Sequence, residues 1–294
     1  MPDYLTTKEY AQSTGLSVTT VRAYCAKGQM PGARRVGGTW RIPIGARPKA
    51  CGEMCKSELL EALTEQMTSR MKGGIYHRTQ VDLTYNSNHI EGSRLTKDET
   101  RYIFETNTIG LTDRAVNVDD IVETVNHFRC VDYVIANACA PLTERFIKRL
   151  HSMLKTGTSD AAKRWFAVGG YKRLPNEVGG EETVAPSKVA AAVRSLLADY
   201  LAKPRIAIDD IIDFHQRFEA IHPFLDGNGR VGRLIMFKEC LCHGVVPFII
   251  TDELRFFYYR GLREWPRVKG YLCDTCLTAQ DEYKELMRRF RVRY

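Results

Sequence analysis

Apolar residues recur every three or four positions along most of the chain. The pattern is clearest in four stretches: "SELLEALTEQM", "DDIVETVNHFRCVDYVIANA", "LTERFIKRLHSMLK" and "SKVAAAVRSLLADYL". This spacing places apolar side chains on one face of a helix, and no strand-like alternation of comparable length accompanies it. We therefore predict a mainly α fold in which the helices pack into a bundle.

Residues 165–186, "WFAVGGYKRLPNEVGGEETVAP", break the helical pattern. Residues that favour strands flank two Gly pairs and a Pro, which is typical of tight turns. This segment predicts a β-hairpin that projects from the bundle.

The first 45 residues predict two short helices followed by two strands. Thr6 and Glu9 have the spacing of a capping box, and Ser17 precedes a second helix that runs to about Lys27. "ARRVGGTWRIP" predicts a hairpin around its Gly pair. Two helices joined by a Gly-containing turn form a helix-turn-helix, and the hairpin is its wing.

The following segment, 46–57, lacks periodicity and carries Pro and Gly, which favours a linker. The predicted organisation is therefore a small winged helix-turn-helix domain at 1–45, the linker at 46–57 and a helical domain at 58–294.

Positive charge is concentrated in the first segment. Residues 1–50 contain eight Lys and Arg against two acidic residues, so they supply +6 of the net charge of +8. A small domain this positive favours a polyanion as its partner, although basic surfaces also serve solubility.

The stretches "YLTTKEYAQSTGLSVTTVRAY" and "GGTWRIP" resemble the winged helix-turn-helix of excisionase and MerR-like proteins. The resemblance implies a second helix in the major groove of double-stranded DNA and a wing on its backbone. A docking module that kept the fold and binds protein is the alternative. The implied DNA contacts are Thr19, Thr20, Arg22, Lys27, Arg34, Arg35 and Arg41.

Composition places the chain among folded soluble proteins, because 44% of its residues are hydrophobic. It shows no signal-peptide pattern and no apolar run long enough for a membrane span. We expect a cytoplasmic protein with no membrane partner, and we expect its nine cysteines to be reduced thiols.

A polar loop lies between two apolar segments in "IHPFLDGNGRVGRL", residues 221–234. Apolar residues at 208, 211, 214, 218 and 221 predict a buried helix that delivers His222 at its end, where Pro223 stops it. A second helix follows the glycines and ends at Gly244. Its predicted apolar side consists of Val231, Leu234, Ile235 and Leu241. The loop thus lies at a helix N-terminus, where unpaired N–H groups favour a phosphate.

The backbone and basic residues of this loop fit an anion. Gly227 and Gly229 allow the backbone to approach it closely, and Asn228 either fixes the loop or donates to phosphate. Arg230 and Arg233 lie on nearly one face of the first helical turn, where their planar groups suit phosphate oxygens.

Two further side chains supply chemistry. Asp226 is the only carboxylate in the loop, and a carboxylate beside a phosphate site is a reasonable Mg²⁺ ligand. His222 is suited to take a proton from a hydroxyl near neutral pH. Together these residues predict a nucleotide phosphate site.

The loop meets every fixed position of the Fic-domain signature, H-P-F-x-[DE]-G-N-G-R-x-x-R. The order of "IKRLHSML", "GGYKR…VGG", "PFII" and "RFFYYRGL" is also similar to that of Fic proteins, over roughly residues 58–290. The resemblance implies a helical bundle with a β-hairpin flap, here Val178, Gly179 and Gly180, that aligns a target protein by strand addition.

The resemblance further implies an ATP- and Mg²⁺-dependent protein adenylyltransferase. A Ser, Thr or Tyr hydroxyl of a target protein, or of the chain itself, would attack the α-phosphate while His222 acts as base and Asp226 holds Mg²⁺. The remaining residues implied for nucleotide binding are Gly227, Asn228, Gly229, Arg230 and Arg233. Tyr258 and Tyr259 either border the adenine pocket or belong to the core.

A second motif lies in "YNSNHIEGSRL", where Ser87 and Glu91 are four apart on a helix that Gly92 can end. It resembles the inhibitory motif [ST]-x-x-x-E-[GN] of self-restrained Fic proteins. By that resemblance Glu91 pairs with Arg233 and occupies the space of the γ-phosphate. The alternatives are a solvated helix-end carboxylate and a residue that positions a water for AMP removal.

Two other functions stay open at this stage. One is a DNA-binding transcriptional regulator whose Fic domain modifies itself, and the other is a Fic relative that removes AMP or transfers another nucleotide or phosphate group. Oligomeric state is also open, with a homodimer as one option.

Overall fold

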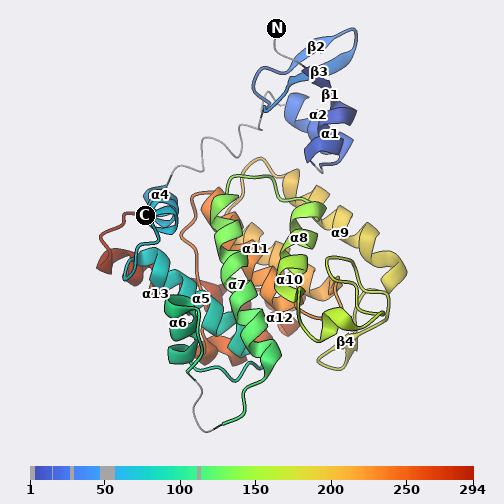
Figure 1. The fold of residues 1–294 in the computed structure, drawn as a ribbon. Helices are drawn as coiled ribbons and strands as arrows, with labels where there is room; N and C mark the ends of the chain where they lie inside the picture. The colour runs from blue at the N-terminus through green and yellow to red at the C-terminus, as the bar shows by residue number, and fades with distance from the viewer. Residues whose placement is uncertain (1–3, 15, 27–29, 47–56, 111–113) are drawn as a thin grey trace.

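The computed structural model of this chain describes residues 4–14, 16–26, 30–46, 57–110 and 114–294 (Figure 1). Lys27 and most of the predicted linker at 46–57 lie outside the described residues. The mainly α architecture predicted from the hydrophobic pattern is confirmed.

The N-terminal segment contains both predicted helices, α1 (Thr7–Thr14) and α2 (Val18–Ala26), and the predicted hairpin, β2 (Arg34–Val36) and β3 (Thr39–Pro43). A third strand, β1 (Tyr4–Thr6), pairs antiparallel with β3 and gives the sheet order β1-β3-β2. The pattern missed β1 because three residues are too few to show alternation. This segment buries its own apolar cluster, which includes Tyr10, Leu16, Val21, Cys25, Met30 and Ile42.

The capping box at the start of α1 is confirmed. The amide of Thr6 donates to Glu9 Oε2 at 2.7 Å, and the amide of Glu9 donates to Thr6 Oγ1 at 3.2 Å. Ser17 caps α2 in the predicted way, because its hydroxyl accepts from the amide of Thr20 at 3.0 Å. Both caps satisfy amides that the first helical turn leaves without a partner.

The rest of the chain is a bundle of helices with one small hairpin, β4 (Glu177–Val178) and β5 (Glu181–Glu182). The helices are α4 (Glu58–Ser69), α5 (Ile75–Ile90), α6 (Lys97–Thr106), α7 (Val118–Ala136), α8 (Glu144–Lys155), α9 (Pro186–Leu201), α10 (Ile208–Ile221), α11 (Asn228–Cys242), α12 (Arg255–Glu264) and α13 (Gly270–Arg289). Short 3-10 turns at Asp160–Ala162 and Asp252–Leu254 complete it.

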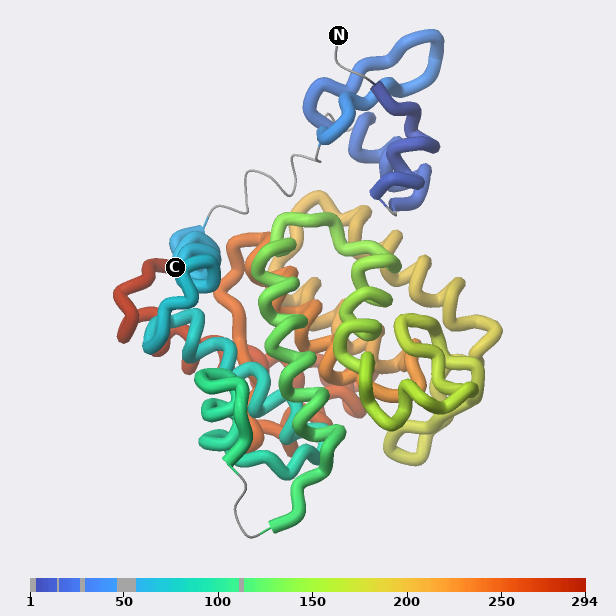
Figure 2. The backbone as a smooth tube through the Cα atoms, in the orientation of Figure 1, coloured from blue at the N-terminus to red at the C-terminus, as the bar shows by residue number. Residues whose placement is uncertain are grey.

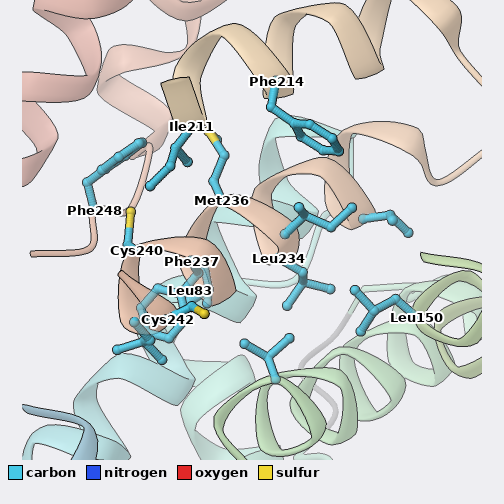
Figure 3. Close-up of a cluster of buried hydrophobic side chains, with 14 of the residues drawn as sticks. Leu83, Leu150, Ile211, Phe214, Leu234, Met236, Phe237, Cys240, Cys242 and Phe248 are labelled. Carbon is cyan, nitrogen blue, oxygen red and sulfur yellow. The ribbon is translucent and has the colours of Figure 1, made fainter. Parts of the chain in front are cut away.

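Helix α11 lies in the middle of the bundle, with α7 and α8 in front of it in the view of Figures 1 and 2. All its residues are buried, because α5, α7, α8 and α10 pack around it. Figure 3 shows side chains of α5, α8 and α10 gathered about Leu234 and Met236. The four residues predicted for its apolar side, Val231, Leu234, Ile235 and Leu241, are buried, and the other sides of the helix are buried as well. Its charged residues must find partners inside the protein.

The described residues also bear on the expectations about membrane spans and cysteines. None of the described helices is long and apolar enough to cross a membrane. Cys25, Cys130, Cys240, Cys242, Cys273 and Cys276 are thiols, as expected. Cys139 is disulfide-bonded, so the expectation of reduced cysteines is wrong at that position.

The contact between α12 and α13 depends on the absence of a side chain at Gly261. A Cβ there would lie 2.7 Å from the backbone Cα of Leu272. We expect Gly261→Ala to lower the free energy of unfolding by about 1–3 kcal/mol, because backbone atoms of α13 must move. Gly270→Ala is the control, since its nearest neighbour would be 4.0 Å away. Urea unfolding of both variants measures the difference, and equal stabilities would contradict a close helix contact.

Candidate active site

His222 lies at the C-terminal end of α10, where the predicted helix stop is confirmed. Its φ of 50° is left-handed, and its amide donates to the carbonyl of Phe218 at 3.0 Å. Asn228 closes the loop that follows, hereafter the catalytic loop (residues 222–227). It accepts from the amide of Phe224 at 2.8 Å and donates to its carbonyl at 2.9 Å. Of the two roles considered for Asn228, the described contacts fix the loop.

The N-terminus of α11 opens at Gly227, whose φ is 81°. Gly229 lies on the first turn, and a Cβ built on it would be 2.2 Å from Oε1 of Glu91. The carboxylate of Glu91 therefore lies directly against the backbone at the positive end of a helix dipole. This is the position in which a helix N-terminus binds an anion.

Arg233 is the side chain that holds Glu91 in this position. Its Nη2 lies 2.7 Å from Glu91 Oε1, and the guanidinium also donates to Oγ and the carbonyl oxygen of Ser87 at 3.0 and 2.9 Å. The Arg233 side chain is 3% exposed, and that of Glu91 is 26% exposed. Burial opposes the charge of Arg233, but the neighbouring Glu91 outweighs it and raises the pKa of the guanidinium. Ser87 and Glu91, four apart at the end of α5, thus reach the same cation.

Glu219 also lies near Arg233 but does not neutralise it. Its Oε1 is buried and has no hydrogen-bond partner among the described residues. Burial, together with the charge of Glu91, raises the pKa of Glu219 to about 8. Glu219 therefore carries a proton at neutral pH, and Glu91 supplies the negative charge that Arg233 needs.

Asp226 is held by two cations. Its Oδ2 lies 2.6 Å from Nζ of Lys155 and 3.1 Å from Nη2 of Arg230. Glu123 of α7 pairs with both cations, so the four groups form a closed ring. Burial by itself would raise the pKa of Asp226, but Arg230 and Lys155 lower it to about 2. Asp226 is therefore an anion across the physiological range.

Asp226 is the side chain at this site that suits a divalent cation. Among the described residues no group of three His, Cys, Asp or Glu could hold a metal ion. The side chain of Asp226 is 44% exposed and its described ion pairs use Oδ2. A single exposed carboxylate suits Mg²⁺, which binds through one or two carboxylates together with nucleotide phosphates and water.

The imidazole of His222 is neutral at physiological pH. Burial, followed by the charge of Lys172, lowers its pKa to about 4. Glu91 and Asp226 act in the opposite direction but are outweighed. A neutral imidazole can accept a proton, which is the property a general base requires.

The two tyrosines differ in exposure. Tyr258 has no exposed surface, and its hydroxyl lies 2.6 Å from Nε2 of His215, which is also buried. Tyr259 is 44% exposed and donates to the carbonyl of Ile90 at 3.2 Å. Of the two, only Tyr259 presents a ring surface to solvent.

The hairpin β4–β5, hereafter the flap (residues 177–182), is exposed, as predicted. Val178 is 49% exposed, and Gly179 and Gly180 have φ of 61° and 84°, which a two-residue hairpin turn requires. The segment before the flap contacts the catalytic loop: the amide of Lys172 donates to the carbonyl of Pro223 at 2.9 Å, and Asn176 Nδ2 donates to that of Phe224 at 3.0 Å.

The residues predicted to contact DNA lie on α2 and on the wing hairpin. Thr19, Arg22, Arg34, Arg35 and Arg41 are exposed, and Thr20 is half-buried beside Ser17. Arg34 stacks over the ring of Tyr4 at 4.5 Å, and Lys27 lies outside the described residues. No salt bridge among the described residues neutralises these arginines.

Sequence reasoning missed Glu123, Lys155, Lys172 and Glu219. Lys155 gave a detectable signal, because it follows Leu154 at the end of the apolar face of α8, where a buried residue is expected. For the others, nothing in their spacing distinguishes them from solvated charged residues.

Residues 141–240 match the Fic/DOC family, and residues 4–44 match a helix-turn-helix domain. "Protein adenylyltransferase Fic" of Drosophila willistoni is 28% identical over 185 residues, which cover 61% of this chain and 35% of the relative. The protein of the same name from Drosophila grimshawi is 27% identical over 184 residues, covering 61% and 36%. The chain thus spans about a third of the length of these curated relatives.

Two solved structures share the fold. A Fic domain containing signaling protein from Bacteroides thetaiotaomicron has a TM-score of 0.63 and 22% identity, covering 78% of this chain and 94% of its own. Fic-1 from C. elegans has a TM-score of 0.62 and 17% identity, covering 82% and 72%.

Proposed function

Because the chain carries a Fic domain and a helix-turn-helix domain, we propose that it transfers AMP from ATP to a hydroxyl group of a protein. The observation that supports this most directly is the arrangement at α11. A neutral His222 precedes a helix N-terminus that already holds an anionic group, the carboxylate of Glu91. The proposed substrates are Mg-ATP and a Ser, Thr or Tyr hydroxyl, on a target protein or on the chain itself.

In this proposal His222 accepts the hydroxyl proton as the hydroxyl oxygen bonds to the α-phosphorus. The bond from that phosphorus to the bridging oxygen breaks, and pyrophosphate leaves with the electron pair. The amides of Gly227 and Gly229 and the guanidinium of Arg233 bind phosphate oxygens. Nucleotide phosphates near His222 add negative charge, which raises its pKa toward the range where a base is effective.

Asp226 would hold Mg²⁺, which neutralises phosphate charge when it is bound with the nucleotide. Lys155 and Arg230 keep Asp226 ionised and fix its Oδ2, so the carboxylate is already in place before the nucleotide arrives. Tyr259, with its exposed ring, is the better of the two tyrosines for a contact with the base of the nucleotide.

His222→Ala tests the base. We expect AMP transfer to fall by about 10²-fold or more, because general-base catalysis is lost, while ATP binding is retained. The measurement is incorporation of labelled AMP into the protein and lysate proteins, with intact mass to separate AMP from phosphate. His77→Ala, on the distant end of α5, is the control. Unchanged transfer by the His222 variant would exclude this role.

We further propose that Glu91 restrains the enzyme. Its carboxylate occupies the anion position against Gly229 and uses the hydrogen bonds of Arg233 that a terminal phosphate would need. A largely buried charge pair such as Glu91–Arg233 stabilises the state that contains it by about a few kcal/mol. A difference of this order keeps most molecules in the restrained state.

Removing the carboxylate should release this restraint. We expect Glu91→Gly to raise AMP transfer by about tenfold or more with the fold unchanged, because a population shift of this size follows from losing about 1.4 kcal/mol or more. Ser87→Ala is the graded comparison: it removes one hydrogen bond to Arg233, keeps the carboxylate and should raise transfer less. If Glu91→Gly binds ATP normally and modifies proteins at the wild-type level, the restraint is refuted.

The same carboxylate supports a second activity, the removal of AMP, in which Glu91 would orient the attacking water. Glu91→Gly would then lose removal while gaining transfer. Release of AMP from a modified protein, measured beside transfer, separates restraint alone from restraint combined with removal.

We propose that the N-terminal segment binds double-stranded DNA, since its arginines are exposed on α2 and the wing. Affinity for a mixed-sequence duplex should fall steeply with salt, and Arg35→Ala should reduce the slope of log K against log salt by about one. Arg164→Ala, exposed elsewhere in the chain, is the control. A chain that does not bind duplex at low salt would favour the protein-docking alternative.

A further inference from the structure

Lys172 is a buried cation without an anionic partner. It is 3% exposed, and among the described residues no carboxylate forms a salt bridge within 4.0 Å of its Nζ. Its ammonium group instead donates to two neutral oxygens, Oδ1 of Asn176 at 2.6 Å and Oγ1 of Thr183. Buried lysines are costly and are normally paired, so this one requires an explanation.

The contacts of Lys172 join the two ends of the flap. Asn176 precedes β4 and Thr183 follows β5, and the hydroxyl of Thr183 also donates to the carbonyl oxygen of Asn176 at 2.9 Å. Lys172, Asn176 and Thr183 therefore form the base of the flap, hereafter the flap base. With its three ammonium protons, the lysine can bind both partners at once.

The flap base is also attached to the catalytic loop. The amide of Lys172 and the side chain of Asn176 donate to the carbonyls of Pro223 and Phe224, the two residues directly after His222. A displacement of the flap base is thus transmitted to the backbone beside His222. Hydrogen bonds to the carbonyls of Pro223 and Phe224 therefore orient the flap strands relative to the imidazole of His222.

We propose that Lys172 is a positioning residue that holds the flap base on the catalytic loop and places a positive charge beside His222. The first effect fixes the register between a target strand aligned on the flap and the base that deprotonates its hydroxyl. The second effect disfavours a proton on the resting imidazole. It also favours release of the accepted proton to solvent after each transfer, so that the neutral base is restored.

The electrostatics around His222 support this role. Burial lowers the pKa of Lys172 to about 8, so the group is still mostly protonated at pH 7. After burial, Lys172 is the strongest influence that lowers the pKa of His222. Two carboxylates act in the opposite direction and raise it, Glu91 at the end of α5 and Asp226 in the same loop as His222. Lys172 therefore offsets two carboxylates.

The charge and the attachment can be tested separately. Lys172→Gln keeps a donor for the flap base but removes the charge, whereas Thr183→Val keeps the charge and removes one partner of the ammonium group. Lys188→Gln, an exposed lysine at the start of α9, is the matched control. The role rests on the proposed function of His222 as base, but both readouts below are taken from the full chain without turnover.

The first readout is the titration of the His222 ring by NMR, assigned by the signal lost in His222→Gln. Lys172→Gln should raise the pKa of His222 by about one pH unit, because a nearby like charge is removed. In Thr183→Val and Lys188→Gln that pKa should stay close to the wild-type value. A wild-type pKa in Lys172→Gln would overturn the electrostatic part even if the enzyme transfers AMP.

The second readout is hydrogen exchange of the peptide spanning residues 170–183. Thr183→Val should exchange several-fold faster than wild type at the amide of Lys172, and Lys188→Gln should not. Unchanged exchange in Thr183→Val would overturn the attachment. If both readouts change as expected while no AMP is transferred by any variant, the proposal for Lys172 stands and the proposed function fails.

Discussion

The structure depends on one constraint: the helix that carries the site, α11, is surrounded by protein, yet it contains charged residues. Arg230 and Arg233 cannot reach water, so each must be neutralised within the bundle. Arg230 is paired with Glu123 of α7 and Asp226 of the loop, and Arg233 with Glu91 at the end of α5. The packing of α5 and α7 against α11 therefore also determines how the two arginines of the site are neutralised.

In the proposed function, restraint and AMP transfer would use the same atoms, and this constraint gives the reason. A buried guanidinium at a helix N-terminus has high affinity for any anion that fits, and the affinity does not distinguish a carboxylate of the chain from a phosphate of a nucleotide. Glu91 satisfies Arg233 when no nucleotide is bound. Removal of Glu91 takes away the carboxylate that Arg233 binds, which makes the empty site favourable for a phosphate.

The two buried lysines near the site, Lys155 and Lys172, differ in the groups that they contact. Lys155 pairs with the carboxylates of Glu123 and Asp226, so its charge is neutralised locally and holds Asp226 in place. In the described part of the chain the ammonium group of Lys172 donates to neutral oxygens alone, so its charge is not cancelled by a carboxylate and acts on His222. Two buried lysines that are similar in exposure therefore act in different ways, and the difference lies in whether a carboxylate is within reach.

The sequence by itself determined most of the helices, the capping box of α1, the N-cap of α2, the flap and the loop that ends α10 at His222, because these follow from local periodicity, caps and glycines. It also determined which residue types meet at the loop. It could not determine that α11 is buried on every side, that β1 joins the small sheet, or that Glu123, Lys155 and Lys172 belong to the site. Each of these depends on segments far apart in the chain, such as α7 against α11 or the flap base against Pro223. Only packing brings those groups together, and burial then fixes the charge that each one carries.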